Sequence, residues 1–126
     1  MNIPDNLLYT REHFWVKKGD LATCGITDYA QNELGDVIFV ELPEEGKKVK
    51  QGDKIGEVES IKTVSYLYAP LSGEVMEVNR ELDKRPELIN QSPYGEGWIC
   101  KIQPENEEEF KNLMNIQRRN LHVIFY

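Results

Sequence analysis

Short runs in which apolar and polar residues alternate occupy most of the chain, and a period of two is typical of β-strands with one buried face. Polar segments that contain glycine separate the runs, as expected for turns. Many short strands joined by turns favour a small sandwich or barrel. The pattern predicts strands at Leu7–Thr10, His13–Lys17, Leu21–Ile26, Val37–Leu42, Ile55–Glu59, Val64–Ala69, Gly73–Val78 and Trp98–Ile102.

Two helices interrupt the strand pattern. The first is predicted to follow Thr27, which is a suitable N-cap, and to end at Gly35. The second is predicted from about Asn106 to Gln117, with acidic residues in its first turn and arginines at its end, an order that complements the helix dipole. Its apolar face would consist of Phe110, Leu113 and Met114. A short helical turn is also expected around Arg85–Ile89.

The composition limits the classes of partner. A chain of 126 residues is long enough for one compact domain, here residues 1–126. Acidic residues outnumber basic ones 22 to 15, and the formal net charge is −7, so we expect no nucleic-acid partner. No apolar run approaches membrane-spanning length, and the first residues resemble neither a secretory signal nor a transit segment. We therefore expect no membrane partner and a cytoplasmic location.

The cysteines and histidines give little support for redox or metal chemistry. Cys24 and Cys100 are far apart in sequence and lack CxxC spacing, so we interpret them as small core residues in a reducing compartment. With His13 and His122 as the only histidines, we expect no metal site and no catalytic residues.

Lys62 has the most informative surroundings. It lies between two strand-like runs joined by a few polar residues, which is the pattern of a β-hairpin. The lysine would then lie at or beside the turn, with its side chain in water. Taken alone, this pattern fits an ordinary exposed lysine as well as an attachment point for a mobile group.

The chain resembles the H protein family of the glycine cleavage system, which are lipoyl carriers, over nearly its whole length. The matching stretches are Tyr9-Thr10-Arg11-Glu12-His13, Gly25-Ile26-Thr27-Asp28-Tyr29-Ala30-Gln31, Leu34-Gly35-Asp36-Val37-Ile38-Phe39-Val40-Glu41-Leu42-Pro43, Val58-Glu59-Ser60-Ile61-Lys62-Thr63-Val64, Tyr68-Ala69-Pro70-Leu71-Ser72-Gly73-Glu74-Val75, Val78-Asn79 and Pro93-Tyr94-Gly95-Glu96-Gly97-Trp98. So many ordered matches at the family's spacing are far more specific than a bare Glu-Ser-x-Lys motif.

The resemblance implies a mainly β barrel-sandwich hybrid, like that of lipoyl and biotinyl carrier domains, with peripheral α-helices. It implies that Lys62 carries lipoate in an amide bond and that lipoylating enzymes recognise Glu59 and Ser60. Gly46 and Gly73 match glycines at which related domains turn sharply.

The resemblance also implies a non-catalytic carrier. In the family, the lipoyl group takes an aminomethyl group from glycine on glycine decarboxylase (P protein). An aminomethyltransferase (T protein) passes the one-carbon unit to tetrahydrofolate, and dihydrolipoyl dehydrogenase (L protein) reoxidises the dithiol. These enzymes and the lipoylating enzymes are the expected partners.

The chain departs from the family in two places near the arm. Phe14 and Tyr66 stand where family members commonly have acidic residues, which are associated with the cleft that shelters the loaded arm. We expect these two aromatics to line such a cleft. The alternative is an H-like lipoate carrier that serves lipoate relay or a sulfur-metabolising redox complex.

The C-terminal tail, about residues 115–126, also departs from the family and ends in the apolar run Leu121-His122-Val123-Ile124-Phe125-Tyr126.

Three other interpretations of the function are weaker. A biotinyl carrier typically has Ala-Met-Lys-Met, whereas this chain has Ser60-Ile61-Lys62-Thr63. A non-lipoylated scaffold would not need Glu59, Ser60 and Lys62 together. An enzyme built on Glu12 and His13 is disfavoured because neighbours on a strand face opposite sides.

Overall fold

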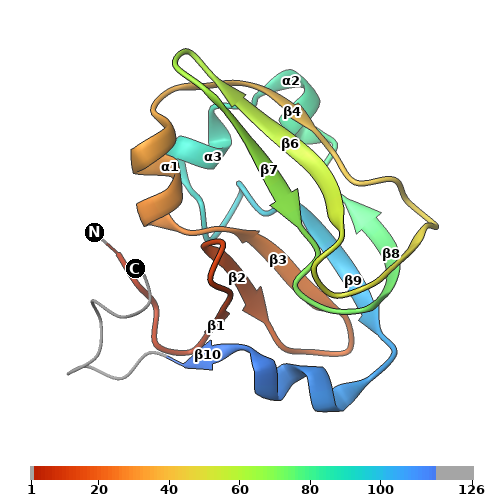
Figure 1. Cartoon of the computed structure of the whole chain (residues 1–126). Coiled ribbons are helices and arrows are strands. Elements are labelled where there is room, and N and C mark those ends of the chain that lie inside the picture. The colour runs from red at the N-terminus through yellow and green to blue at the C-terminus, as the bar shows by residue number, and fades with distance from the viewer. Residues whose placement is uncertain (1, 116–126) are drawn as a thin grey trace.

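The structure is a computed structural model that describes residues 2–115. Its strands form two antiparallel sheets, one of seven strands in the order β10-β1-β2-β3-β9-β8-β5 and one of three in the order β4-β6-β7 (Figure 1). The strands are β1 (Leu8–Tyr9), β2 (Phe14–Lys17), β3 (Ala22–Ile26), β4 (Val37–Glu41), β5 (Lys48–Val49), β6 (Lys54–Ser60), β7 (Val64–Tyr68), β8 (Gly73–Val78), β9 (Cys100–Pro104) and β10 (Met114–Asn115).

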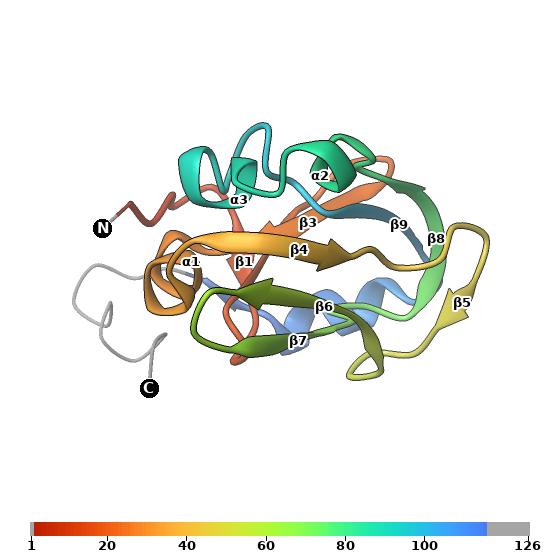
Figure 2. The ribbon, with the colours of Figure 1, turned by 90° about the horizontal axis from the view of Figure 1, so that it is seen from above.

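Short helices lie around the sheets. They are α1 (Asp28–Leu34), α2 (Glu81–Lys84), α3 (Leu88–Gln91) and the 3₁₀ helix η1 (Glu107–Asn112). Figure 2 shows α2 and α3 along one side of β4 and the β6–β7 hairpin along its other side. The turn of this hairpin lies next to the end of α1 in both views (Figures 1 and 2).

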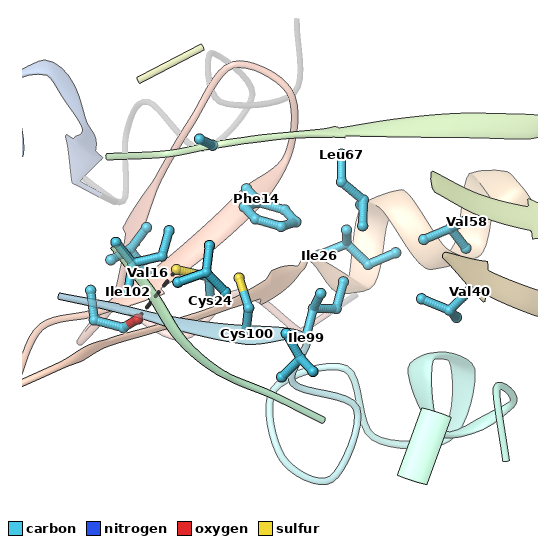
Figure 3. Packing of buried hydrophobic residues seen from close by; sticks show 14 of the residues in the cluster. Phe14, Val16, Cys24, Ile26, Val40, Val58, Leu67, Ile99, Cys100 and Ile102 are labelled. Atoms are coloured by element: carbon cyan, nitrogen blue, oxygen red, sulfur yellow. Dashed lines mark hydrogen bonds between the residues drawn. The ribbon is translucent and has the colours of Figure 1, made fainter. Parts of the chain in front are cut away.

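The core fills the space between the two sheets (Figure 3). The three-stranded sheet contributes Val40, Val58 and Leu67, which are almost fully buried. Phe14 and Ile26 pack in the same cluster from the larger sheet. Because alternate residues of a strand point to opposite faces, burying one face of β4, β6 and β7 leaves their other face exposed. The mainly β sandwich architecture expected from the sequence is confirmed.

Each of the predicted strands corresponds to a strand in the structure, with its ends shifted by a few residues at most. Two short strands were not predicted, β5 and β10. Lys48 and Val49 of β5 pair with Glu74 and Gly73 of β8. A two-residue strand is too short to show a period of two, so only its long-range partner defines it.

The predicted first helix is confirmed. α1 has Thr27 as its N-cap, and the Thr27 hydroxyl accepts a hydrogen bond of 3.1 Å from the backbone N–H of Ala30. The helix ends at Gly35, whose φ of 77° and ψ of −160° lie in a region that only glycine adopts readily. The helical turn expected around Arg85–Ile89 coincides in part with α3.

The predicted second helix is wrong in type and length. The segment forms only the 3₁₀ helix η1, and the backbone is extended again at Leu113. Both oxygens of the Glu109 carboxylate accept hydrogen bonds from Ser72, from its N–H at 2.7 Å and from its hydroxyl at 2.8 Å. Met114 then pairs with Tyr9 of β1. These contacts with distant segments outweigh the helical pattern of the sequence.

Among residues 2–115, no helix is long and apolar enough to cross a membrane. Of the C-terminal tail predicted at about residues 115–126, only Asn115 is described, as the end of β10. The apolar run from Leu121 onward lies outside the described residues.

Candidate functional site

Lys62 lies in the turn that joins β6 to β7. Glu59 and Val64 are the last register partners before the turn, and the Ser60 N–H donates to the Thr63 carbonyl at 2.8 Å. The turn residues Ile61, Lys62 and Thr63 are all exposed. The hairpin predicted from the sequence therefore presents the Lys62 amine at its tip.

The Ser60 side chain organises the turn from within. Its hydroxyl accepts hydrogen bonds from the Lys62 N–H at 3.2 Å and the Thr63 N–H at 3.1 Å, and donates to the Thr63 carbonyl at 3.2 Å. Ser60 is only 5% exposed. Its hydroxyl is therefore committed to the backbone around Lys62, and its role in recognition by a lipoylating enzyme stays a prediction.

The segment after α1 supports the turn from one side. The Asp36 carbonyl accepts a hydrogen bond of 3.1 Å from the Ile61 N–H. The Lys62 side chain lies against Gly35, because a Cβ placed on Gly35 would be 2.9 Å from Lys62 Cε. The outer part of the lysine stem therefore lies on the backbone of Gly35, while Lys62 as a whole is exposed.

Asn90 of α3 holds this supporting segment in place, and the sequence analysis did not single it out. Its amide nitrogen donates to the Gly35 carbonyl and to Gln31 Oε1, both at 2.9 Å. Its carbonyl oxygen accepts from the Val37 N–H at 2.9 Å. Nothing in the local sequence pattern distinguishes Asn90 from a loop asparagine, because its partners come from another part of the chain.

Glu59 lies on the exposed face of the hairpin, one residue before the turn. It faces Phe39 on β4 and Val64 on β7 in the sheet register. Glu59 is exposed, so its carboxylate is accessible to a partner protein. Its recognition by lipoylating enzymes also stays a prediction.

Gly46 and Gly73 lie together at the other end of the molecule from the Lys62 turn, where β5 meets β8. Gly46 has φ of 85° and donates its N–H to the Val75 carbonyl at 2.7 Å. Gly73 faces Val49 in the register. A Cβ on Gly73 would lie 2.0 Å from the Gln103 carbonyl oxygen, so only glycine fits there. Both glycines shape the scaffold and do not contact Lys62.

The structure does not bring Phe14 and Tyr66 together in one cleft. Phe14 is 2% exposed and packs in the core between the sheets (Figure 3). Tyr66 is half exposed on the outer face of β7, with Lys54 Nζ 4.1 Å from the centre of its ring. Phe14 therefore offers no surface to an arm, and of the two predicted cleft residues only Tyr66 is accessible. Residue 14 points inward from β2, and a cleft that shelters the arm stays a prediction.

The two cysteines are core residues, as predicted. Cys24 and Cys100 are free, fully buried and opposite one another on β3 and β9. Burial raises the pKa of the Cys24 thiol well above its usual value, and the neighbouring Cys100 adds to the effect. Among residues 2–115, no group of three or more His, Cys, Asp or Glu side chains is placed to hold a metal ion.

Comparisons with known proteins point in one direction. Residues 7–123 match the family model described as glycine cleavage H-protein. A glycine cleavage system H protein from Symbiobacterium thermophilum is 54% identical over 115 residues, which are 90% of each chain. One from Bacteroides fragilis is 48% identical over 118 residues, 93% of this chain and 94% of the relative. The crystal structure of a glycine cleavage system H protein from Mycobacterium marinum superposes with a TM-score of 0.79 at 40% identity, covering 86% of this chain and 95% of that one.

Proposed function

Because the chain belongs to the glycine cleavage H-protein family, we propose that its lipoyl group is attached to the amine of Lys62. The family consists of non-catalytic lipoyl carriers, and the role of this chain is that of a lipoyl carrier in glycine cleavage. Its fold is the barrel-sandwich of lipoyl carriers. The observation that supports Lys62 is its position at the exposed tip of a hairpin whose turn is fixed by Ser60 and Asp36.

The surroundings of Lys62 fit a covalently attached arm. Among the described residues, no carboxylate lies within salt-bridge distance of its Nζ, so no ion pair has to break before the amine reacts. The stem passes close to the backbone of Gly35, and the Lys62 residue as a whole is exposed. When bound, the lipoyl group would supply a disulfide ring that can take up the aminomethyl unit with its own reduction, and a dithiol that can be reoxidised once that unit has been transferred.

The contribution of the chain itself is to hold the attachment point of the lipoyl arm in place. The turn fixes the root of the arm, and tethering gives the arm's tip an effective concentration on the order of mM at a docked enzyme. The proposed partners are glycine decarboxylase, aminomethyltransferase, dihydrolipoyl dehydrogenase and the lipoylating enzymes. A net charge of −7 favours reversible docking onto basic surfaces of such proteins. A cytoplasmic setting is part of the proposal, since the free thiols Cys24 and Cys100 suit a reducing compartment.

The test is glycine–bicarbonate exchange on glycine decarboxylase, with carrier whose lipoylation has been verified by intact mass. We expect exchange with the lipoylated chain and none with Lys62→Arg, because a guanidinium does not form the lipoyl amide. Lys48→Arg, at another exposed lysine, is the matched control and should behave like the parent chain. Exchange that persists in Lys62→Arg would exclude Lys62 as the attachment site.

A further inference from the structure

The exposed apolar side chains of the described residues gather on one sheet. Large hydrophobic residues with high exposure are Ile38, Phe39, Ile61, Val64, Tyr66 and Met76. All except Met76 belong to the β4-β6-β7 sheet or to the turn that carries Lys62. Phe39, Val64 and Tyr66 are 54%, 48% and 51% exposed. Exposed apolar side chains grouped in this way mark interaction surfaces more often than scattered ones do.

The sheet register arranges these side chains in two rows with carboxylates. Phe39, Glu59 and Val64 face one another across the three strands, in the row nearest Lys62. Glu41, Glu57 and Tyr66 form the next row. Since residues two apart on a strand share a face, both rows lie on the same outer side. We call these six residues the hairpin face.

The charge of the hairpin face is only partly balanced within the chain. Glu57 forms a salt bridge with Lys54, with Nζ 2.8 Å from Oε1, and the same Nζ lies over the Tyr66 ring. In the part of the chain that the structure describes, no basic side chain lies within salt-bridge distance of Glu41 or Glu59. The face therefore complements an apolar surface that is bordered by lysine or arginine.

Two other sides of the hairpin are occupied by the rest of the chain. The inner face of β6 and β7 packs in the core through Val58 and Leu67. One side of the turn rests on the α1–β4 junction, through the Asp36 carbonyl and Gly35. The hairpin face is therefore the open sheet surface that lies directly beside the Lys62 turn.

We propose that the hairpin face is the docking surface for the enzyme that attaches the lipoyl group, and that this enzyme presents an apolar patch bordered by basic residues. This inference rests on the proposed attachment at Lys62. Enzymes that act on the dithiolane meet the far end of a long arm and can hold the carrier body at a distance. The attaching enzyme has no arm to use, and its reaction centre must come to Nζ itself. There Nζ gives up a proton and bonds to the acyl carbon of an activated lipoyl donor, an acyl-phosphate anhydride or a thioester, whose leaving group departs with the electron pair.

The experiment measures lipoylation of the full-length, unmodified chain by a lipoate–protein ligase supplied with lipoate and ATP. Initial rates are followed by intact mass at varied carrier concentration. Phe39→Ser and Tyr66→Ser should each lower kcat/KM roughly tenfold, chiefly through a higher KM, because truncating a central apolar contact weakens docking. Met76→Ser, at an equally exposed apolar position of β8, is the matched control and should stay within about twofold of the parent chain.

The dependence of the lipoylation rate on salt concentration measures how much the carboxylates contribute to docking, separately from the apolar contacts. The kcat/KM of the parent chain should fall as NaCl is raised, and Glu41→Gln should reduce that dependence, whereas Glu87→Gln on the surface near α3 should not. Unfolding midpoints of all variants are measured alongside, so that a lost fold is not taken for lost docking.

The outcomes distinguish this inference from the proposed function. No mass increase at Lys62 of the parent chain would overturn the attachment site itself. Normal lipoylation with equal effects of Phe39→Ser and Met76→Ser would overturn the docking surface alone. The docking-surface proposal would also be overturned if sedimentation showed that the parent chain is a dimer and that Phe39→Ser makes it a monomer. The same holds if deleting residues 116–126 abolished the effect of Phe39→Ser, because the chain's own end would then be the occupant.

Discussion

The side chain of Lys62 crosses the backbone of Gly35 so closely that a Cβ on Gly35 would lie 2.9 Å from Lys62 Cε and 3.8 Å from Nζ. Gly35 lies just before β4, Lys62 lies in the turn after β6, and the hydrogen bond from the Ile61 N–H to the Asp36 carbonyl joins the two segments. The base of the arm is therefore defined by a glycine that ends a helix.

Replacing Gly35 by Ala should destabilise the chain by about 1–3 kcal/mol, because its φ and ψ lie in a region that is strained for other residues. Gly52→Ala is the control, since Gly52 has φ of 93° and no heavy atom within 4 Å of the added Cβ. Urea unfolding measures the loss of unfolding free energy in each of the two variants. The NMR signals of the Lys62 ε-methylene should shift only in Gly35→Ala. Equal spectra of this group in the two variants would contradict the contact.

Replacing Ser60 by Ala should loosen the turn that carries Lys62. The change removes the hydroxyl that accepts from the Lys62 and Thr63 N–H groups, and we expect a loss of about 1–2 kcal/mol. Hydrogen exchange of these two amides should become faster, while the amides at the centre of β6 keep their protection. Ser65→Ala on β7, where the structure shows no side-chain hydrogen bond among the described residues, should leave both amides unchanged.

Replacing Asn90 by Ala should disturb the support beneath the arm from a distance. The Val37 N–H and the Gly35 carbonyl both lose a hydrogen-bond partner, which should cost about 2–3 kcal/mol. Amide chemical shifts around Asp36 and Ile61 should change with it. Asn112→Ala removes one exposed side-chain bond to Gln51 and should cost well under about 1 kcal/mol. A similar cost for the two variants would argue against the role assigned to Asn90.

The stability of the fold should depend on the charge of His13. Burial lowers the pKa of His13, although the Glu12 and Glu33 carboxylates act in the opposite direction. The unfolded chain therefore binds a proton at higher pH than the folded chain does. The contribution of His13 is complete above the unfolded pKa of about 6.5 and is lost as the pH falls through the folded pKa.

His13→Asn tests this dependence, because His13 has φ of 67° and asparagine tolerates a positive φ better than most residues. The free energy of unfolding of the parent chain should decrease between about pH 7 and pH 5, and the variant should show a smaller decrease over the same range. An unchanged pH dependence in His13→Asn would assign the effect to other groups.

Much of the fold was predictable because its signals are local. A period of two marks each of the main strands, Thr27 and Gly35 mark both ends of α1, and polar residues between two strand-like runs mark the hairpin with Lys62 at its turn. These features depend on residues within a few positions of one another, where side-chain alternation, capping and turn preferences operate. The resemblance to the H-protein family then gave the lysine a chemical meaning.

The remaining features were decided by contacts between distant segments. β5 and β10 exist because β8 and β1 pair with them, and the segment around Glu109 forms a 3₁₀ helix because its carboxylate binds Ser72. Phe14 shares one face of β2 with Val16, and packing between the two sheets decided that this face is the one inside the main core. Asn90 acquired its three partners in the same way. The sequence by itself determined which lysine is displayed. Only the tertiary structure decided which backbone supports Lys62 and which sheet face next to it is exposed. The reason is that hydrogen bonds and packing between residues far apart in the chain produce no periodic pattern in the local sequence.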